Sequence, residues 1–193
     1  MIVEGLLTTK NSSGMTNVAP MGPIVKGDFE SLILRPFKGS TTYRNLTSTR
    51  GGVFHIVDRV NLIAEAAIRQ LNVLPDVRPA SVIDGVVLAD CCRCFELKVV
   101  EIDESSDRTV MNAEIVHTQE IRPHQGFNRA RHAVIEAAIL ATRVHLLPQS
   151  EIDTVLKFLG PAVEKTGAEE EKAAYRMVTS HIAAHYAESQ PRG

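Results

Sequence analysis

The chain is organised around one stretch, Arg35-Pro36-Phe37-Lys38-Gly39-Ser40-Thr41-Thr42-Tyr43-Arg44-Asn45-Leu46. An apolar, strand-like run precedes it, and its second half has the character of a short helix. Glycine lets the backbone approach a ligand closely, while hydroxyls and the first amides of a helix are donors without intrahelical partners. Arginine and lysine add charge, and a guanidinium can hold two phosphate oxygens at once. The stretch predicts either a phosphate-binding turn or an ordinary surface turn in which Ser40 or Thr41 caps a helix.

Two further motifs flank this turn along the chain. Asn17-Val18-Ala19-Pro20-Met21-Gly22 lies upstream, and Gly126-Phe127-Asn128-Arg129-Ala130-Arg131-His132-Ala133-Val134 lies downstream. With the central turn between them, the order resembles the flavin-reductase-like, FMN-binding split barrels. It is most similar to an archaeal and bacterial family of unknown function within that superfamily. The resemblance covers nearly the whole chain, and it implies a mixed α+β fold, mainly β: a split antiparallel β-barrel over residues 1–125 and a C-terminal helical subdomain over residues 126–193.

The resemblance also implies where a cofactor would bind. The cofactor would be FMN, held at a homodimer interface, with its phosphate in the central turn and its ring along the Asn-x-Ala-Pro strand. The phosphate residues would be Arg35, Lys38, Ser40, Thr41 and Thr42; the ring residues Ala19, Pro20 and Met21, with Asn17 and Thr9 near by and Asn45 supporting the pocket. His55 stands where many relatives carry Asn, so it contacts the flavin or is a core histidine. Asn128 and Arg129 would close over the phosphate or an anionic substrate, or form ordinary helix-surface charge.

Composition narrows the function classes. The chain has 193 residues and a net charge of −2, which argues against a dedicated nucleic-acid binder. No apolar run approaches the length of a membrane span, and no basic segment followed by a long apolar stretch opens the chain. All three cysteines stand together in Cys91-Cys92-Arg93-Cys94, which is not a disulfide framework. We therefore expect a cytoplasmic protein that binds neither nucleic acid nor membrane.

The hydrophobic pattern predicts the elements of the barrel. Expected strands cover residues 2–9, 16–25, 29–34, 53–57, 82–88, 91–102 and 108–119, with helices at 40–48 and 58–72. Prolines at 20 and 23 cannot donate to a ladder, so the second strand must lie at an edge or be broken there. Asp58 is the expected N-cap of the helix that follows it.

Helical periodicity dominates after residue 125. A long amphipathic helix is expected over 127–145, with small residues along one face. Ser150-Glu151-Ile152-Asp153 predicts a capping box for a second helix that stops at Gly160-Pro161. Thr166 to Glu169 predicts a third helix that runs to about residue 187.

Metal binding is not predicted. Structural zinc commonly needs two separated ligand pairs, and the cysteine cluster offers no second pair, so the cysteines are packing residues or reactive thiols. His181 and His185 share a helical face but lack an obvious third ligand.

The chain contains no nucleophile elbow, no Walker loop and no dinucleotide fingerprint, so no catalytic residue is predicted. If the protein is an enzyme, a cofactor carries the chemistry. The leading hypothesis is an FMN-dependent oxidoreductase that acts on a small molecule and takes hydride from NAD(P)H or another reduced carrier. The alternative is a non-catalytic flavin or pterin binder, linked to pterin-dependent one-carbon metabolism. A third hypothesis is a structural dimer without cofactor.

Overall fold

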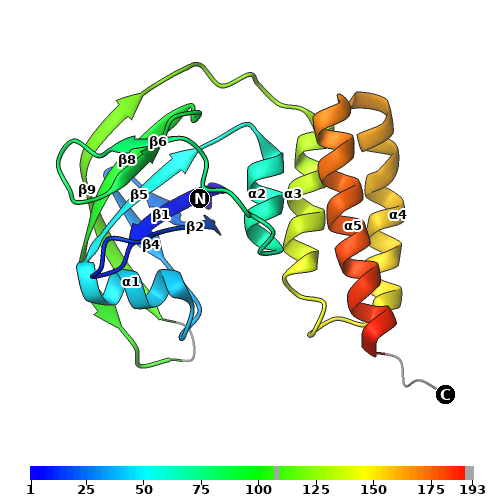
Figure 1. The fold of residues 1–193 in the computed structure, drawn as a ribbon, viewed down its shortest axis with the longest axis horizontal. Helices are drawn as coiled ribbons and strands as arrows, with labels where there is room; N and C mark the ends of the chain where they lie inside the picture. Colours follow the sequence, from blue (N-terminus) through cyan, green and yellow to red (C-terminus); the bar gives the residue numbers. More distant parts are fainter. Residues whose placement is uncertain (107–108, 190–193) are drawn as a thin grey trace. The chain divides into compact units, whose positions relative to one another are not determined.

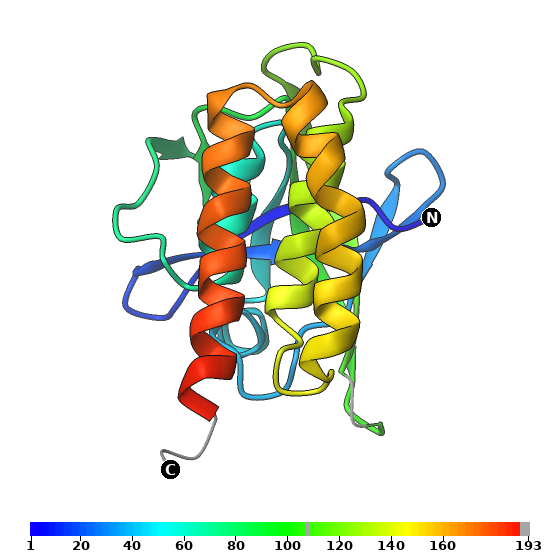
Figure 2. The same ribbon diagram turned by 90° about the vertical axis from the view of Figure 1, so that its right-hand side faces the viewer.

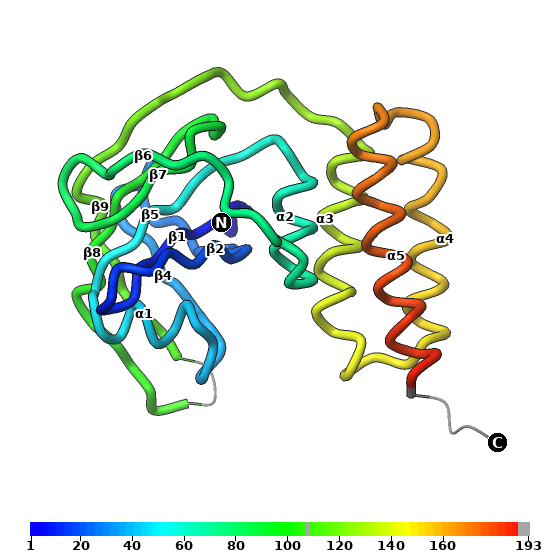
Figure 3. Tube along the Cα trace, in the orientation of Figure 1, coloured from blue at the N-terminus to red at the C-terminus, as the bar shows by residue number. Residues whose placement is uncertain are grey.

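A computed structural model describes residues 1–106 and 109–189 in two compact units. The first unit combines residues 1–57 with 73–124, and the second combines 58–72 with the chain from residue 125 onward. The chain therefore passes between the units three times, a path that can be followed in Figure 3. The segment from Asp58 to Asn72, which lies inside the expected first domain of residues 1–125, belongs to the helical unit.

The first unit is built on a curled antiparallel sheet (Figure 1). In the described chain the sheet has seven strands in the order β2-β1-β5-β8-β9-β4-β3, and a separate hairpin pairs β6 with β7. The strands are β1 (Gly5–Lys10), β2 (Thr16–Met21), β3 (Ile24–Lys26), β4 (Ser31–Leu34), β5 (Gly51–Ile56), β6 (Val77–Pro79), β7 (Val86–Leu88), β8 (Arg93–Asp103) and β9 (Val110–Glu120). The N-terminus bridges toward the far edge, because Ile2 pairs with Ile24 and Val25 N–H donates to Met1 O at 2.8 Å. This link curls the sheet toward closure.

The core of this unit lies inside the curl. Phe54 and Phe95 from neighbouring strands are fully buried and lie with ring centroids 6.3 Å apart, and Leu7, Leu34 and Leu97 pack in the same cluster. Phe95, Leu97 and Val99 on β8 are buried, as their alternation in the sequence predicts. Cys94 and Glu96, at the alternate positions, are each 1% exposed as well, so this part of β8 is buried on both faces.

Several expected strands are shorter than the sequence pattern suggests. The strand expected over 16–25 is broken at Gly22-Pro23 into β2 and β3, and β2 is an edge strand, as its prolines require. The strand expected over 29–34 begins at Ser31, because Phe29 adopts a φ of 59° in the preceding turn. The strand expected over 82–88 is confined to β7, since Val82 and Ile83 donate their amides to Glu96 and join a loop. The start of the strand expected over 108–119 lies partly outside the described residues.

Helix α1 (Thr41–Thr49) follows the central turn and packs on β1, β2 and β5. Ser40 is its N-cap, with Oγ accepting from Tyr43 N at 3.1 Å, and Arg50 ends it in the left-handed conformation. Gly51 and Gly52 follow as the first residues of β5. A Cβ on Gly52 would lie 3.2 Å from Thr8 O, so glycine permits the close approach of β5 to β1.

The second unit is a bundle of helices. It contains α2 (Val60–Ala67), α3 (Arg129–Ala141), α4 (Gln149–Thr166) and α5 (Glu169–Ser189). Figure 2 shows α4 and α5 side by side with α3 beside them, and α3 also packs against both α2 and α5. Small and branched side chains make the shared core, among them Ala64, Val134, Ala137 and Val178. No helix among the described residues is both long enough and apolar enough to span a bilayer.

Three expectations for the helical unit are wrong in detail. Asp58 does not cap α2; its buried carboxylate accepts from Gln125 N–H at 3.1 Å instead, and α2 begins after Arg59. The expected capping box at Ser150 is absent, because α4 begins at Gln149 after Pro148 and places Ser150 inside its first turn. At the third helix only one half of such a box exists, two residues later than expected, where Ala168 N–H donates to the Glu171 carboxylate at 2.9 Å. Thr166 is the last residue of α4.

Helix α4 also does not stop at Gly160-Pro161, as the sequence predicts, but continues to Thr166. Proline inside a helix removes one hydrogen bond and costs about 3 kcal/mol. The second half of α4 packs on α3 through Val163, which is 1% exposed, and this burial holds the helix together past the break. Helix α3 ends at Ala141 rather than at 145, because residues 142–146 form turns, in which Arg143 N–H donates to Leu140 O at 2.8 Å.

Candidate functional site

The start of α1 gathers four of the predicted site residues into a hydrogen-bonded group. Asn17 Nδ2 on β2 donates to Thr42 Oγ1 at 3.1 Å, and Asn45 Nδ2 on α1 donates to Thr9 Oγ1 on β1 at 3.0 Å. Thr9, Thr42 and Asn45 are buried, while Asn17 is half-buried. These two bonds fix the N-terminal turn of α1 against the edge of the sheet.

The same helix start presents donors that the fold does not use. Ser40 Oγ accepts from the third amide of α1, but the amides of Thr41 and Thr42 have no partner among residues 1–106 and 109–189. Arg35 is half-buried at the end of β4 and makes no hydrogen bond or ion pair within the same residues. Free amides at a helix N-terminus, together with the helix dipole, favour an anion. The geometry supports an anion site at the start of α1.

Other cations of the central turn are occupied by the protein. Lys38 Nζ donates to the carbonyl oxygens of Glu104 at 3.0 Å and Ser106 at 2.7 Å. The Arg44 guanidinium donates to Gly39 O and, at 3.2 Å, to Thr41 Oγ1. The Tyr43 hydroxyl donates to the Glu104 carboxylate, and this bond raises the pKa of the phenol. These contacts close the turn against the β8–β9 connection and leave Arg35 as its unengaged cation in the described chain.

The predicted ring-binding residues lie on the edge strand beside this site. Ala19, Pro20 and Met21 pair with Leu7, Leu6 and Gly5 of β1, and all three are half-buried. An edge strand leaves alternate backbone groups unpaired, and Pro20 has no amide to pair. The carbonyl oxygens and remaining amides on this edge can therefore bond a planar heterocycle.

His55 lies in the core rather than at the surface. The side chain is fully buried, Nε2 accepts from Leu88 N–H at 3.1 Å, and Nδ1 lies 3.2 Å from Leu6 O. Because Nε2 is an acceptor, Nδ1 carries the proton and the ring is neutral. Burial lowers the pKa of His55 to about 4. Both ring nitrogens are thus used to join β1, β5 and β7.

Asn128 and Arg129 belong to the helical unit. Asn128 is the N-cap of α3: Oδ1 accepts from Ala130 N at 2.9 Å and Arg131 N at 3.1 Å, while Nδ2 donates to Thr166 O at 3.0 Å. Its side chain is therefore committed to the fold. Arg129 is exposed and lines a groove between α3 and α4.

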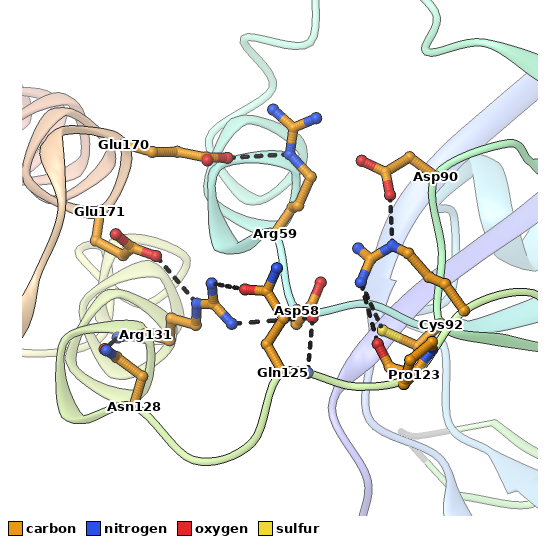
Figure 4. Close-up of polar contacts among 11 residues, drawn as sticks. Asp58, Arg59, Asp90, Cys92, Pro123, Gln125, Asn128, Arg131, Glu170 and Glu171 are labelled. Carbon is orange, nitrogen blue, oxygen red and sulfur yellow. Dashed lines mark hydrogen bonds and ion pairs between the residues drawn. The ribbon is translucent and has the colours of Figure 1, made fainter.

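An ion-pair network lies next to Asn128, and sequence reasoning did not identify it (Figure 4). The Arg131 guanidinium donates to Glu171 at 3.0 Å and to Gln125 Oε1 at 2.6 Å, and lies 3.9 Å from Asp58. Burial alone would raise the pKa of Glu171, but hydrogen bonds from Arg131 and Ala168 hold it below its ordinary value. The i, i+3 spacing of Asn128 and Arg131 marked the segment, but only the fold brings in Asp58 and Glu171.

The cysteines are buried and free. Arg122 donates to Cys92 Sγ at 3.4 Å and to Asp90 at 2.8 Å. A hydrogen bond between the Cys91 and Cys94 side chains raises the pKa of Cys91 and lowers that of Cys94. Among the described residues, no three histidine, cysteine or acidic side chains come together as a metal site.

Comparisons with known proteins identify the family of this chain. Residues 3–122 match the N-terminal domain model of the protein family of unknown function DUF447, and residues 128–180 match the second DUF447 model. The chain belongs to the DUF447 family. No curated protein matches it.

Solved structures of the DUF447 family and its neighbours share the fold. The FMN-bound DUF447 protein MM1853 from Methanosarcina mazei superposes with a TM-score of 0.81 at 21% identity, over 93% of this chain and 94% of that chain. The 2-nitrobenzoate 2-nitroreductase NbaA of Pseudomonas fluorescens gives a TM-score of 0.52 at 21% identity, over 61% and 64% of the two chains. Flavoredoxin of Desulfovibrio vulgaris (Miyazaki F) gives 0.50 at 17% identity, over 62% and 69%. The fold is thus the FMN-binding type of split barrel with a helical part, which confirms the expected fold class.

Proposed function

We propose that this DUF447 protein binds FMN, with the phosphate at the N-terminus of α1. One observation carries the proposal: the amides of Thr41 and Thr42 and the guanidinium of Arg35 have no partner in the described chain, while the side chains of Lys38 and Arg44 are bonded within the protein. A phosphate carries the oxygens that these donors require. That MM1853 and other proteins of the same fold bind FMN supports the same assignment.

The flavin ring would lie along β2. Ala19, Pro20 and Met21 offer backbone groups on an edge strand, and Asn17 orients the adjoining Thr42. Bound FMN supplies reversible two-electron chemistry, and the protein supplies position and electrostatics. The chain itself would bind the phosphate, align the ring edge with the β2 backbone and keep the Thr9–Asn45 pair dry beneath it. A homodimer in which the second chain covers the ring is part of the proposal.

We further propose flavin-dependent oxidation or reduction of a small molecule as the activity. Its support is the fold, which nitroreductase NbaA and a putative flavin reductase share. A non-catalytic flavin or pterin carrier uses the same pocket and is the alternative. Reduction of the bound flavin by an electron donor, NAD(P)H in the simplest case, distinguishes the enzyme from the carrier.

The test of the cofactor is a titration of FMN into the apoprotein, followed by gel filtration with detection of flavin absorbance. Co-elution of flavin with protein at the size of a dimer is expected. Arg35→Glu should weaken FMN binding at least about tenfold, because it replaces a phosphate donor with a repelling charge. Lys26→Glu is the matched control, an exposed charge reversal on β3. Equal FMN affinity in wild type and Arg35→Glu would reject the α1 site.

The test of activity is the bleaching of bound flavin by NADH and NADPH under anaerobic conditions. Reduction followed by reoxidation with a nitroaromatic or quinone acceptor supports an oxidoreductase. A tightly bound flavin that neither nicotinamide reduces supports the carrier.

A further inference from the structure

The helical unit contains a second site, separate in residues and chemistry from the α1 turn. It is an open groove of about 370 Å³ between α3 and α4. Helix α3 contributes Arg129, His132, Ala133 and Glu136, and α4 contributes Phe158, Leu159, Pro161, Ala162 and Lys165. The four α3 residues recur at i, i+3, i+4 and i+7, and so do Phe158, Pro161, Ala162 and Lys165 on α4, with Leu159 beside them. Each helix therefore contributes one stripe to the groove.

The groove is polarised along its length. Asn128 Nδ2 donates to Thr166 O at 3.0 Å, so the start of α3 lies beside the end of α4. Arg129 and Lys165 therefore come to the same end of the groove, and both side chains are exposed there. His132 follows one turn along, and Glu136 lies at the opposite end. None of these four side chains has a hydrogen bond or ion pair with a residue that the structure describes.

Between the two charged ends the groove is apolar. Ala133, Leu159 and Ala162 line this part, and Phe158, which is 82% exposed, lies seven residues before Lys165 and thus toward the Glu136 end. An exposed aromatic ring offers a stacking surface. Figure 2 shows α4 on the near face of the bundle, with α3 beside it.

The break in α4 coincides with the groove. Pro161 removes the hydrogen bond that its position would donate to the carbonyl oxygen of Lys157, and Gly160 precedes it. Helix α4 thus contains two unfavourable helix residues in its interior, and Pro161 lines the groove directly. The volume falls within the range of small-ligand sites, about 300–1,000 Å³.

We propose that the α3–α4 groove binds a small aromatic organic anion. The anionic group lies between Arg129 and Lys165, the ring lies against Phe158 over the alanines, and a hydrogen-bond donor at the far end of the ligand reaches Glu136. This ligand class matches all three parts of the groove at once. The groove shares no residue with the α1 site.

The experiment uses 4-aminobenzenesulfonate as the probe, because it has an anion and an N–H donor at opposite ends of a ring. The probe is titrated into the full-length, isotopically labelled protein saturated with FMN, and amide shifts are followed by NMR. Shifts concentrated in residues 129–136 and 158–165 are expected. Benzenesulfonate lacks the donor and aniline lacks the anion, so both should bind more weakly than the probe.

Matched variants separate a specific site from general attraction of an anion. The double variant Arg129→Glu/Lys165→Glu should lose at least about tenfold in probe affinity. Arg143→Glu/Lys157→Glu makes the same change in net charge on the same two-helix region with residues outside the groove, and should bind the probe normally. Phe158→Ser should weaken binding while leaving both charges in place. Scattered shifts, equal losses in the two double variants, or full affinity in Arg129→Glu/Lys165→Glu would each overturn the proposal.

Discussion

Two helix starts in this protein look alike in sequence and differ in what the fold leaves available. Helix α1 begins Ser40-Thr41-Thr42-Tyr43-Arg44, and α3 begins Asn128-Arg129-Ala130-Arg131, so each has a good N-cap followed within four residues by at least one arginine. In α1 the cap satisfies one amide and leaves those of Thr41 and Thr42 without a partner in the described chain.

In α3 the cap satisfies two amides, and Thr166 Oγ1 also accepts from Ala130 N at 3.1 Å. The Arg131 guanidinium is paired with buried carboxylates, whereas that of Arg35 near α1 makes no hydrogen bond or ion pair in the described chain. A helix start therefore becomes an anion site only when neighbouring elements leave its donors without partners. A cap and a cation are not sufficient.

The largest change in stability is expected from removing Arg131, the cation that pairs with buried carboxylates. Arg131→Ala removes the guanidinium from beside the carboxylates of Glu171 and Asp58, whose side chains are 7% and 1% exposed, while the backbone amides of Ala168 and Gln125 still donate to them. Loss of one member of a buried ion pair costs about 3–5 kcal/mol, so urea unfolding should show a fall in stability of at least about 3 kcal/mol.

The control for Arg131 is an arginine in an exposed pair of the same unit. Arg59 and Glu170 form an ion pair with side chains 46% and 43% exposed, so Arg59→Ala should cost less than about 1 kcal/mol. Adding Glu171→Gln to Arg131→Ala should recover part of the loss. Equal losses of stability in Arg131→Ala and Arg59→Ala would contradict the larger contribution that we assign to the buried ion pair.

A third group of amides, at Ser81, Val82 and Ile83, tests the same rule inside the barrel unit. They donate to the Glu96 carboxylate at 2.6, 2.7 and 3.1 Å. Burial would raise the pKa of Glu96, but these three hydrogen bonds outweigh it and hold the pKa below its ordinary value. Glu96→Gln offers one acceptor in place of two and should destabilise the protein by about 2 kcal/mol at pH 7.

The pH dependence of Glu96 has a definite sign. Because the folded pKa is below the unfolded value, the stabilisation is complete above the unfolded pKa and is lost as the pH falls through the folded one. Urea unfolding at pH 7 and at lower pH should therefore show a smaller acid-induced loss in Glu96→Gln than in wild type. Parallel pH profiles would show that the Glu96 carboxylate is not what holds these amides.

The next effect removes a single donor at the α1 site. Thr41 is the first residue of α1, where proline is well tolerated, and Ser40 already has an extended conformation that suits a following proline. Thr41→Pro should fold normally but weaken FMN binding about tenfold, since one phosphate donor is lost.

The matched variant is Arg129→Pro at the same position of α3, which should leave FMN affinity unchanged. Thr41→Ala keeps the amide and separates its effect from that of the hydroxyl. A Thr41→Pro protein that binds FMN as wild type would show that the amide of Thr41 has no phosphate contact.

The smallest effect is expected from Lys38. Its amine already donates to Glu104 O and Ser106 O, so Lys38→Met should lower FMN affinity less than about threefold. Isothermal titration beside Arg35→Glu ranks the two cations. A larger loss for Lys38→Met than for Arg35→Glu would show that the lysine leaves its carbonyl partners when FMN binds.

The sequence was sufficient for the elements whose signals are local. Ser40 as a cap, the edge position of β2 and the burial of Phe95, Leu97 and Val99 on β8 follow from propensity, proline chemistry and hydrophobic pattern. The resemblance placed the split barrel and the central turn. What could not be read locally depends on distant partners.

Asp58, Glu96 and Lys38 illustrate why. Each looks like a surface or capping residue, and each is used by a segment far along the chain: Asp58 by Gln125, Glu96 by the 81–83 loop, and Lys38 by the β8–β9 turn. Pro161 stays inside α4 for a similar reason, because packing of Val163 on α3 compensates a local break.

Helix α2 has a consequence for biosynthesis. Val60, Ala64 and Ile68 pack with α3 and α5, although α2 precedes β6 to β9 in the chain. During translation this apolar face emerges long before the helices that cover it, and the barrel strands are made in between. A nascent chain that has reached β9 therefore still exposes the apolar face of α2, which is the kind of surface that chaperones recognise. Completion of α5 is the event that ends this exposure.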